Sequence, residues 1–236
     1  MKTKSPVQTE TRNNEAMPSL GEVLLPHLQV IYPADADNVL ADLLALIERY
    51  QAKGFQKIDE RWNESDIMLI TYGDSMIRNE EPPLETLKAF VDHYLPGMIN
   101  IIHVLPFFPH SSDGGFSVID FRQVDSKLGD WQHIENMAED FKLMFDIVIN
   151  HVSRESLWFA DYISDVPPAN EYFIEVDPQT DLSAVTRPRC SPLLAEINTP
   201  RGSKHVWATF SEDQIDLNYQ NPAVLLEMVD IVLGYL

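Results

Sequence analysis

The stretch KLMFDIVINHVSRES, residues Lys142–Ser156, decides how the chain folds. It begins as an apolar run over Leu143–Ile149 that only Asp146 interrupts, and it then presents Asn150 and His151 before a polar loop. A short, nearly continuous apolar run is typical of a strand that is covered on both faces. The sequence therefore predicts a buried strand over residues 143–149 that carries a carboxylate and ends on Asn-His.

Two earlier apolar runs, over residues 67–70 and 99–105, predict two more strands of the same kind. Apolar residues at helical spacing predict a helix over residues 82–97, with Pro83 near its start, and another that begins at the capping residue Asp130. Because strands and helices alternate, the sequence predicts an α/β fold with a parallel sheet.

Helices are also predicted on both sides of this alternating region. The first covers residues 35–54 and ends at Gly54, and the last begins with Asn221 as its N-cap and Pro222 at its first position. Between them, residues 152–210 are rich in Pro, Asp, Ser and Thr and show no clear helical period. Only EYFIEVD, residues 171–177, is a candidate strand there.

The composition excludes several classes of function. The formal net charge of −20 argues against a nucleic-acid partner, because binding to phosphate backbones requires clustered Lys and Arg. No apolar run approaches the ~20 residues of a membrane span, and we expect no membrane partner. The polar N-terminus lacks the apolar core of a signal peptide and predicts a disordered tail. The single Cys190, interpreted as an inert thiol, fits a cytoplasmic location.

Polar side chains follow each predicted strand, at the end where such sheets carry their sites. Those that follow the three strands in turn are Tyr72 and Asp74, then His110, Asp113 and Phe116, then Asn150 and His151. The alternative is structural: Asp113 belongs only to a turn, and His151 only satisfies a backbone carbonyl. Asp146 is predicted to be buried and paired with backbone N–H groups or an arginine. No spacing matches a metal site, so we expect neither a metal nor a cofactor.

Arg187 and Arg189 flank Pro188 in a chain that is poor in cations. The proline restricts the local backbone, so the two guanidinium groups are presented in a restricted way. An arginine in this setting suits a phosphate or carboxylate ligand. The alternative is a surface arginine that pairs with one of the many acidic residues.

Several segments together resemble the sucrose phosphorylase group of glycoside hydrolase family 13, in the alpha-amylase clan. They are ITYGDSM, IHVLPFFPHSSDGGFSVIDFRQVDSKLGDW, FDIVINHVS, RPR and WATFSEDQIDLNYQNPAVLLEM. The match runs in order from about Asp66 to Leu236, and the form LPFFPHSSDGGFSVIDF indicates this group over true amylases. RPRCSPLL, TFSEDQIDLNY and the helical segment ahead of the first strand are more similar to glucosylglycerate phosphorylases.

The resemblance implies the N-terminal part of a (β/α)8 TIM barrel with a B domain inserted after the third strand. The expected division is a tail over 1–20, a helical extension over 21–65, three βα units over 66–151, the B domain over 152–215, and a helix over 216–236. Three strands out of eight would leave unpaired sheet edges and an exposed apolar face. The implied reaction transfers a glucosyl group from an alpha-glucoside, sucrose or glucosylglycerate, to inorganic phosphate with retention of configuration.

The resemblance also implies roles for individual residues by matching position. Asp113 and His151 would bond sugar hydroxyls, and Phe116 would line the same donor pocket. Arg189 would face the acceptor side and help to hold phosphate. The residues at structural positions of the family signature are Asp146 and Asn150.

Retaining glycosyl transfer requires two carboxyl groups about 5 Å apart, a nucleophile and an acid/base. The resemblance places these on the fourth and fifth barrel strands, and no RLDA-like segment occurs in the 236 residues. We therefore expect an incomplete barrel, a fragment that is inactive alone, with its catalytic residues beyond Leu236. The alternatives are half of a split enzyme with a C-terminal half chain as partner, a non-catalytic carbohydrate-binding remnant, and an alpha-amylase-clan glucosidase.

Overall fold

The computed structural model describes residues 18–54, 63–187 and 189–236. By their internal contacts, the residues form two compact units, 1–45 and 46–236. Most of the predicted tail, part of the predicted helical extension and Pro188 lie outside the described residues. Among the described residues, no helix combines the length and the apolar character needed to cross a bilayer.

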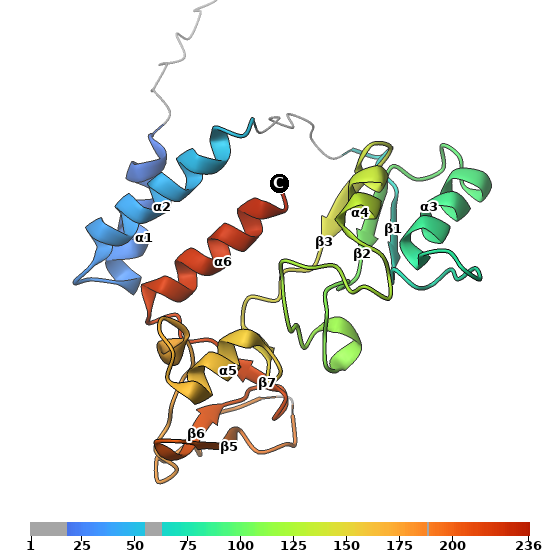
Figure 1. Ribbon diagram of the computed structural model, residues 1–236. Helices are drawn as coiled ribbons and strands as arrows, with labels where there is room; N and C mark the ends of the chain where they lie inside the picture. The colour runs from blue at the N-terminus through green and yellow to red at the C-terminus, as the bar shows by residue number, and fades with distance from the viewer. Residues whose placement is uncertain (1–17, 55–62, 188) are drawn as a thin grey trace, which may run out of the picture. The chain divides into compact units, whose positions relative to one another are not determined.

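The first unit contains α1 (Leu20–Ile31) and most of α2 (Ala36–Gln51) (Figure 1). The helix predicted over residues 35–54 is confirmed as α2, while α1 was not predicted as a separate helix. α1 begins where the Ser19 hydroxyl and the Glu22 carboxylate form a capping box, in which Glu22 accepts from the Ser19 amide at 2.7 Å. This pairing satisfies free amide groups at the start of the helix.

The second unit begins with β1 (Met68–Thr71), β2 (Ile101–Val104) and β3 (Lys142–Phe145), which form a parallel sheet in that order (Figure 1). The connecting helices are α3 (Pro83–Tyr94) and α4 (Trp131–Ala138). Asp130 caps α4, as predicted, because its carboxylate accepts from the His133 amide at 3.3 Å. The predicted α/β fold with parallel strands is therefore confirmed in this region.

The two faces of the sheet differ in their coverage. Ile102 and Val104 of β2 point to one face and are fully buried, together with Leu84 of α3 and Met137 of α4. On the opposite face, Ile70 of β1 is 59% exposed in the described structure. The apolar runs predicted strands that are covered on both faces, and for β1 this is wrong. The exposed apolar face agrees with the expectation of an incomplete barrel.

The third predicted strand is shorter than its apolar run. β3 ends at Phe145, and a separate strand, β4 (His151–Ser153), pairs antiparallel with β7 (Gln214–Asp216). The predicted strand over residues 143–149, ending on Asn-His, is therefore wrong beyond Phe145. Ile147 and Ile149 lie between the two strands and are 42% and 49% exposed. Apolar character alone did not distinguish residues that continue the sheet from residues that leave it.

Residues 152–210 contain more regular structure than the sequence predicted. They form α5 (Leu157–Ser164) and a hairpin of β5 (Leu194–Thr199) and β6 (Gly202–Trp207), neither of which was predicted. The candidate strand at residues 171–177 makes only isolated bridges, at Phe173 and Glu175. The remaining elements of the second unit are two short 3-10 turns, η1 (Asp113–Gly115) and η2 (Ala169–Glu171), and a final helix, α6 (Pro222–Gly234).

α6 agrees with its prediction, because Asn221 caps it and accepts from the Ala223 amide at 3.0 Å. The buried side chains of the second unit form one continuous apolar core, to which α6 contributes Val224 and Met228. This core supports both the parallel sheet and the irregular segment that follows it, and the polar side chains of interest lie at its margin.

Candidate functional site

Three segments that are far apart in the sequence meet beside β4, and we call them the polar seam. They are residues 111–118 after β2, residues 150–154 around β4, and residues 209–216 leading into β7. In the β4–β7 ladder, His151 is opposite Asp216 and Ser153 is opposite Gln214. The Ser153 amide also donates to the Val118 carbonyl at 2.7 Å. The polar seam gathers four of the six predicted site residues: Asp113, Phe116, Asn150 and His151.

His151 lies at the centre of the polar seam and is 5% exposed. Its Nε2 lies 3.0 Å from the carbonyl oxygen of Phe116, so Nε2 carries the proton and donates to that carbonyl. Burial lowers the pKa of His151, although the hydrogen bond to Phe116 and the charges of Asp216 and Asp113 act to raise it. The imidazole is therefore neutral at pH 7. His151 thus does satisfy a backbone carbonyl, as the structural alternative predicted.

Gln214, for which no role was predicted, lies between His151 and Asp113. Its Nε2 lies 3.0 Å from Oδ2 of Asp113 and 3.1 Å from Nε2 of His151. Its Oε1 accepts from the Ser211 hydroxyl at 2.9 Å, which fixes the orientation of the amide. Because the Nε2 proton of His151 goes to the Phe116 carbonyl, the two Nε2 atoms face each other as donors and form no hydrogen bond. The amide thus presents an N–H donor next to the Asp113 carboxylate. A hydroxyl group placed among them can accept from Gln214 and donate to Asp113, which is how a protein holds a sugar hydroxyl.

Asp113 reaches this position through an unusual backbone. Its φ is 56°, and Gly114 and Gly115 follow at 61° and 103°. Left-handed conformations are uncommon for residues other than glycine, although aspartate tolerates them better than most. At Gly115 an added Cβ would lie 2.7 Å from the Pro106 carbonyl oxygen, so only glycine fits. The loop is therefore more than a simple turn, because a strained residue carries the carboxylate.

Two aromatic side chains belong to this region. Phe116, predicted to line the donor pocket, is half-buried, and its carbonyl receives the His151 proton. Its role as a pocket wall stays a prediction. Phe210 was not singled out, yet its ring centroid lies 4.9 Å from that of His151. The signal that could have identified Phe210 is its place in TFSEDQIDLNY, the segment that also supplies Gln214.

Two further residues of the polar seam, Asp216 and Asn150, lie next to His151. The Asp216 carboxylate accepts from the Thr209 amide at 2.9 Å and from the Thr209 hydroxyl at 2.6 Å. The Asn150 side-chain amide lies 3.4 Å from Asp216, and the Asn150 carbonyl accepts from the Leu217 amide at 2.9 Å. Asn150, which directly precedes β4, therefore contacts both β7 and the residue after it, and its role in the family signature stays a prediction.

Asp146 lies outside the polar seam. It follows the last residue of β3, and its Oδ2 lies 2.8 Å from Nε2 of His103 on the neighbouring strand β2. Its side chain is 27% exposed. The prediction of a buried carboxylate within a strand, paired with backbone amides or an arginine, is wrong in this structure. Its observed partner is a histidine, His103.

Arg187 and Arg189 differ in their surroundings. Arg187 donates to the Thr209 carbonyl at 2.8 Å and so anchors its loop to the polar seam. Arg189 is exposed, and its guanidinium carbon lies 5.8 Å from the ring centroid of Phe210. In the described part of the chain, neither arginine forms an ion pair with a carboxylate. The alternative of an arginine paired with a surface acid is therefore not what the described residues show.

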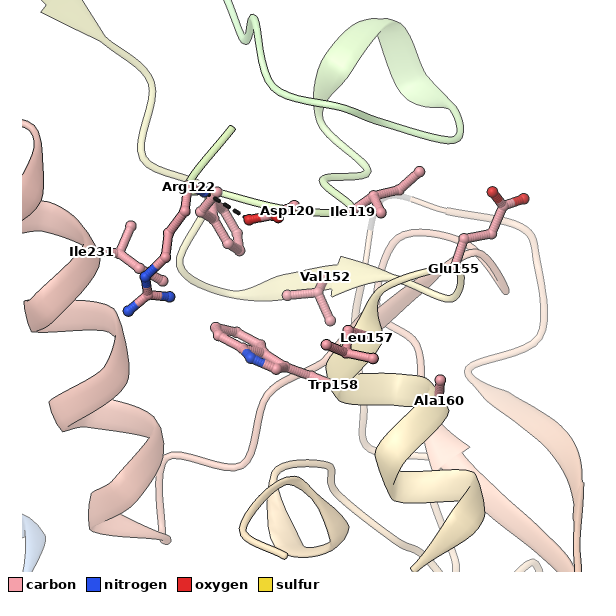
Figure 2. Close-up of a pocket in the computed structure, with 10 residues that line it drawn as sticks. Ile119, Asp120, Arg122, Val152, Glu155, Leu157, Trp158, Ala160 and Ile231 are labelled. Atoms are coloured by element: carbon pink, nitrogen blue, oxygen red, sulfur yellow. Dashed lines mark hydrogen bonds between the residues drawn. The ribbon is translucent and has the colours of Figure 1, made fainter. Parts of the chain in front are cut away.

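Two cavities lie in the second unit near these residues. One, of about 420 Å³, is lined by Tyr72, Asp74, His110 and Gly114, so residues that follow β1 and β2 do meet there. The other, of about 460 Å³, has Trp158 and Val152 in its wall and Arg122 at its edge (Figure 2), and none of the predicted site residues lines it. Across residues 18–54, 63–187 and 189–236, no group of three or more His, Cys, Asp or Glu side chains could hold a metal ion.

Comparisons with known proteins agree with this arrangement. The family model described as alpha amylase, catalytic domain, matches residues 93–236. A glucosylglycerate phosphorylase from Allomeiothermus silvanus is 48% identical over 218 residues, which are 92% of this chain and 39% of the relative. A sucrose phosphorylase from Streptococcus mutans is 36% identical over 64% of this chain and 33% of the relative.

A solved structure of a phosphorylase is also similar to this chain. The crystal structure of sucrose 6F-phosphate phosphorylase from Thermoanaerobacter thermosaccharolyticum matches with a TM-score of 0.65 and 27% identity, over 74% of this chain and 38% of that one. The chain thus spans less than two fifths of the length of each of these three relatives. The matched structure supports a partial α/β barrel as the architecture of the second unit.

Proposed function

The chain belongs to the alpha-amylase family, glycoside hydrolase family 13, and from this premise we propose that it forms the donor-sugar half-site of a retaining glycoside phosphorylase. Such an enzyme transfers a glucosyl group from an alpha-glucoside to inorganic phosphate. The observation that carries the proposal is the contact of Gln214 with both Asp113 and His151. This cluster lies in a chain that is 48% identical to a glucosylglycerate phosphorylase.

In this function the polar seam binds the glucosyl group. Asp113 accepts from one sugar hydroxyl, and Gln214 donates to the oxygen of the same or the neighbouring hydroxyl. His151, neutral because of its burial, bonds a further sugar hydroxyl without adding a buried charge, and shares its Nε2 proton between that hydroxyl and the Phe116 carbonyl. The rings of Phe116 and Phe210 provide apolar surface for the carbon-bound hydrogens of the sugar.

Arg189 holds the phosphate in this proposal. Its guanidinium is permanently charged and is exposed beside Phe210. In a chain with a net charge of −20, a guanidinium that has no carboxylate partner among the described residues is well suited to an anionic ligand. Arg187 acts differently, because its bond to the Thr209 carbonyl fixes the loop that carries Arg189.

The nucleophile and the acid/base belong to further barrel strands in this proposal. The exposed face and the open edges of the β1-β2-β3 sheet suit the addition of such strands. They come either from more of the same polypeptide or from a C-terminal half chain. The B domain corresponds to residues 152–215, between β4 and α6, and the proposed location is the cytoplasm, which suits the exposed free thiol of Cys190.

Glucosylglycerate is the donor that we favour over sucrose. The identity to the glucosylglycerate phosphorylase is 48% over 92% of this chain, against 36% over 64% for the sucrose phosphorylase. The match to the glucosylglycerate phosphorylase thus has the higher identity and covers more of this chain, including the whole proposed half-site. A glucosidase that transfers to water is disfavoured by Arg189, which has no carboxylate partner among the described residues and is better matched to phosphate than to water.

The test is a binding titration followed by a turnover assay. Methyl α-glucoside and glucosylglycerate are titrated into the 236-residue chain, with NMR spectra as the readout, alongside Asp113→Ala and His151→Ala. We expect weak binding by the parent chain and at least about tenfold weaker binding by both variants, a loss of about 1.4 kcal/mol. Asp181→Ala, which changes an exposed aspartate in another loop, is the matched control and should bind like the parent.

The turnover assay separates the remaining alternatives. We expect phosphate-dependent glucosyl transfer only when the chain is mixed with a polypeptide that supplies the missing strands. Arg189→Ala should then reduce the rate at low phosphate far more than at saturating phosphate. Binding without turnover in any mixture would favour the non-catalytic carbohydrate-binding alternative. Turnover by the 236 residues alone would contradict the assignment of the catalytic carboxylates to other strands.

A further inference from the structure

Asp213 accepts a second set of hydrogen bonds, beside the predicted site. Its Oδ2 accepts from the hydroxyl of Ser111 at 2.7 Å and from that of Ser117 at 2.9 Å, and the Ser112 hydroxyl donates to the same oxygen. Its backbone carbonyl accepts from the Arg154 amide at 2.9 Å. Asp213, which belongs to the third segment of the polar seam, therefore bonds to both of the other segments.

The number of protons and the strength of the acceptors together give the direction of these hydrogen bonds. An ionised carboxylate only accepts, and each serine hydroxyl has one proton to give. The Ser111 hydroxyl has two possible acceptors, the Asp213 carboxylate at 2.7 Å and the Ser117 hydroxyl at 3.0 Å, and the charged carboxylate is the stronger one. Ser111 therefore donates to Asp213, and the Ser153 hydroxyl at 2.6 Å donates to Ser111. Ser153 in turn accepts from the Glu155 amide at 2.9 Å. The result is a continuous relay in which each bond polarises the next.

The ionised state of Asp213 is supported by its surroundings. Burial by itself would raise the pKa of the carboxyl group, but hydrogen bonds from Ser111, Ser112 and Ser117, with the charge of Arg154, outweigh burial and lower it. Ser117 and Ser153 are fully buried, so their hydroxyls depend on partners within the protein. Replacement of Asp213 by an apolar residue would leave buried donors unsatisfied.

The Asp213 contacts lie one residue away from the predicted sugar contacts. Ser112 bonds to Asp213, and the next residues along both segments, Asp113 and Gln214, bond to each other at 3.0 Å. Two adjacent cross-links thus join the same two loops. The loop that carries Asp113 has only a single 3-10 turn and a left-handed backbone, so its position depends on such external bonds.

We propose that Asp213 is a positioning residue of the donor-sugar site, whose carboxylate holds the loop of Asp113 at a fixed distance from Gln214. The proposal rests on the proposed function for the identity of the ligand, but the positioning itself is a property of the free chain. Asp213 touches no sugar. It sets the separation of the two groups that bind the same hydroxyl, so its loss should act on affinity through the geometry of that pair.

The experiment records the side-chain amide signals of Gln214 in spectra of the free 236-residue chain, followed by titration with methyl α-glucoside. In Asp213→Ala we expect the Gln214 signals to move toward those of a solvent-exposed amide, and affinity to fall at least tenfold. Asp213→Asn keeps one acceptor oxygen and should be intermediate. Ser112→Ala removes one exposed donor and should lower affinity about threefold. Asp181→Ala serves as control and should change neither readout.

The outcomes separate this proposal from the proposed function. If Asp213→Ala folds and both the Gln214 signals and the affinity are unchanged, the positioning role is wrong. If Asp213→Ala does not fold, unchanged signals in Asp213→Asn and Ser112→Ala would equally show that the positioning role is wrong. If the parent chain binds no glucoside, the proposed function fails, and the Gln214 signals of the free variants still decide the role of Asp213.

Discussion

The parallel sheet and the polar seam are held together by different forces. The sheet side is apolar: Ile102, Val104 and Phe107 are fully buried there. The polar seam is held by hydrogen bonds among hydroxyls, amides and carboxylates from three distant segments. Apolar burial is non-directional and tolerates small shifts, whereas hydrogen bonds lose their strength with poor geometry. Apolar burial therefore stabilises the sheet region, whereas the hydrogen bonds of the polar seam fix the relative positions of its polar side chains.

The largest effect should come from the apolar side, through Phe107→Ala. The ring of Phe107 lies 4.4 Å from that of Phe108 and 4.9 Å from that of Phe145, between centroids. Its removal leaves a cavity and should lower the free energy of unfolding by about 3–5 kcal/mol. Urea denaturation measures the loss. Ile77→Ala, at a side chain that is 74% exposed, is the control and should change stability by less than about 0.5 kcal/mol.

The next effect tests the polar side, through Asp216→Ala. Asp216 is 6% exposed and accepts two hydrogen bonds from Thr209, so its removal leaves donors without a partner. We expect a loss of about 1.5–3 kcal/mol in the free energy of unfolding, and weaker binding of methyl α-glucoside. Thr209→Val should cost less in the Asp216→Ala background than in the parent chain, because both changes remove the bond between Thr209 and Asp216. The remaining cost comes from the Trp207 indole N–H, which donates to the Thr209 hydroxyl at 3.0 Å. Full additivity of the two changes would contradict this pairing.

Gly115→Ala tests the loop that carries Asp113. The new Cβ would meet the Pro106 carbonyl oxygen at 2.7 Å, at a φ of 103°. The matched control is Gly202→Ala, where φ is 108° and no atom lies within 4 Å of the new Cβ. Both changes strain the backbone by about 1–3 kcal/mol, and the steric clash should make the loss at Gly115 larger. Equal losses in thermal and urea unfolding would show that the loop yields to the clash.

The smallest effect is a pH dependence, and it should be confined to the polar seam. The pKa of His151 is lowered from 6.5 in the folded chain, so the unfolded chain binds the proton more tightly. Stability is therefore greatest above pH 6.5 and falls as the pH decreases from there toward the folded pKa, with a slope of at most about 1.4 kcal/mol per pH unit. His151→Gln should remove this dependence, as measured by urea unfolding at several pH values.

Two controls sharpen the pH experiment. His93→Gln, at an exposed histidine of α3, should leave the dependence of the parent chain in place. Phe107→Ala should lower the whole curve without changing its slope between about pH 5 and 7.5. If the free energy of unfolding of His151→Gln still changes with pH in this range, the titrating group is not His151. The pH dependence would then not distinguish the polar seam from the sheet.

Much of the fold followed from local patterns in the sequence. The three parallel strands, the capped helices α4 and α6, and the amphipathic helix α2 were predicted because apolar period and capping residues act over a few positions. α5 and the β5–β6 hairpin were not, because their segment has no strong period. The strand predicted to continue to Asn-His ends at Phe145, since the chain leaves the sheet to reach β7.

The sequence by itself determined which residue types follow the strands, and from them it predicted that Asp113, Asn150 and His151 belong to one site. Only the tertiary structure decided that Gln214 joins them and that Asp213 ties their loops, because those contacts link positions about 100 residues apart. Local patterns act over a few residues, whereas the geometry of these hydrogen bonds depends on how β4 and β7 pair.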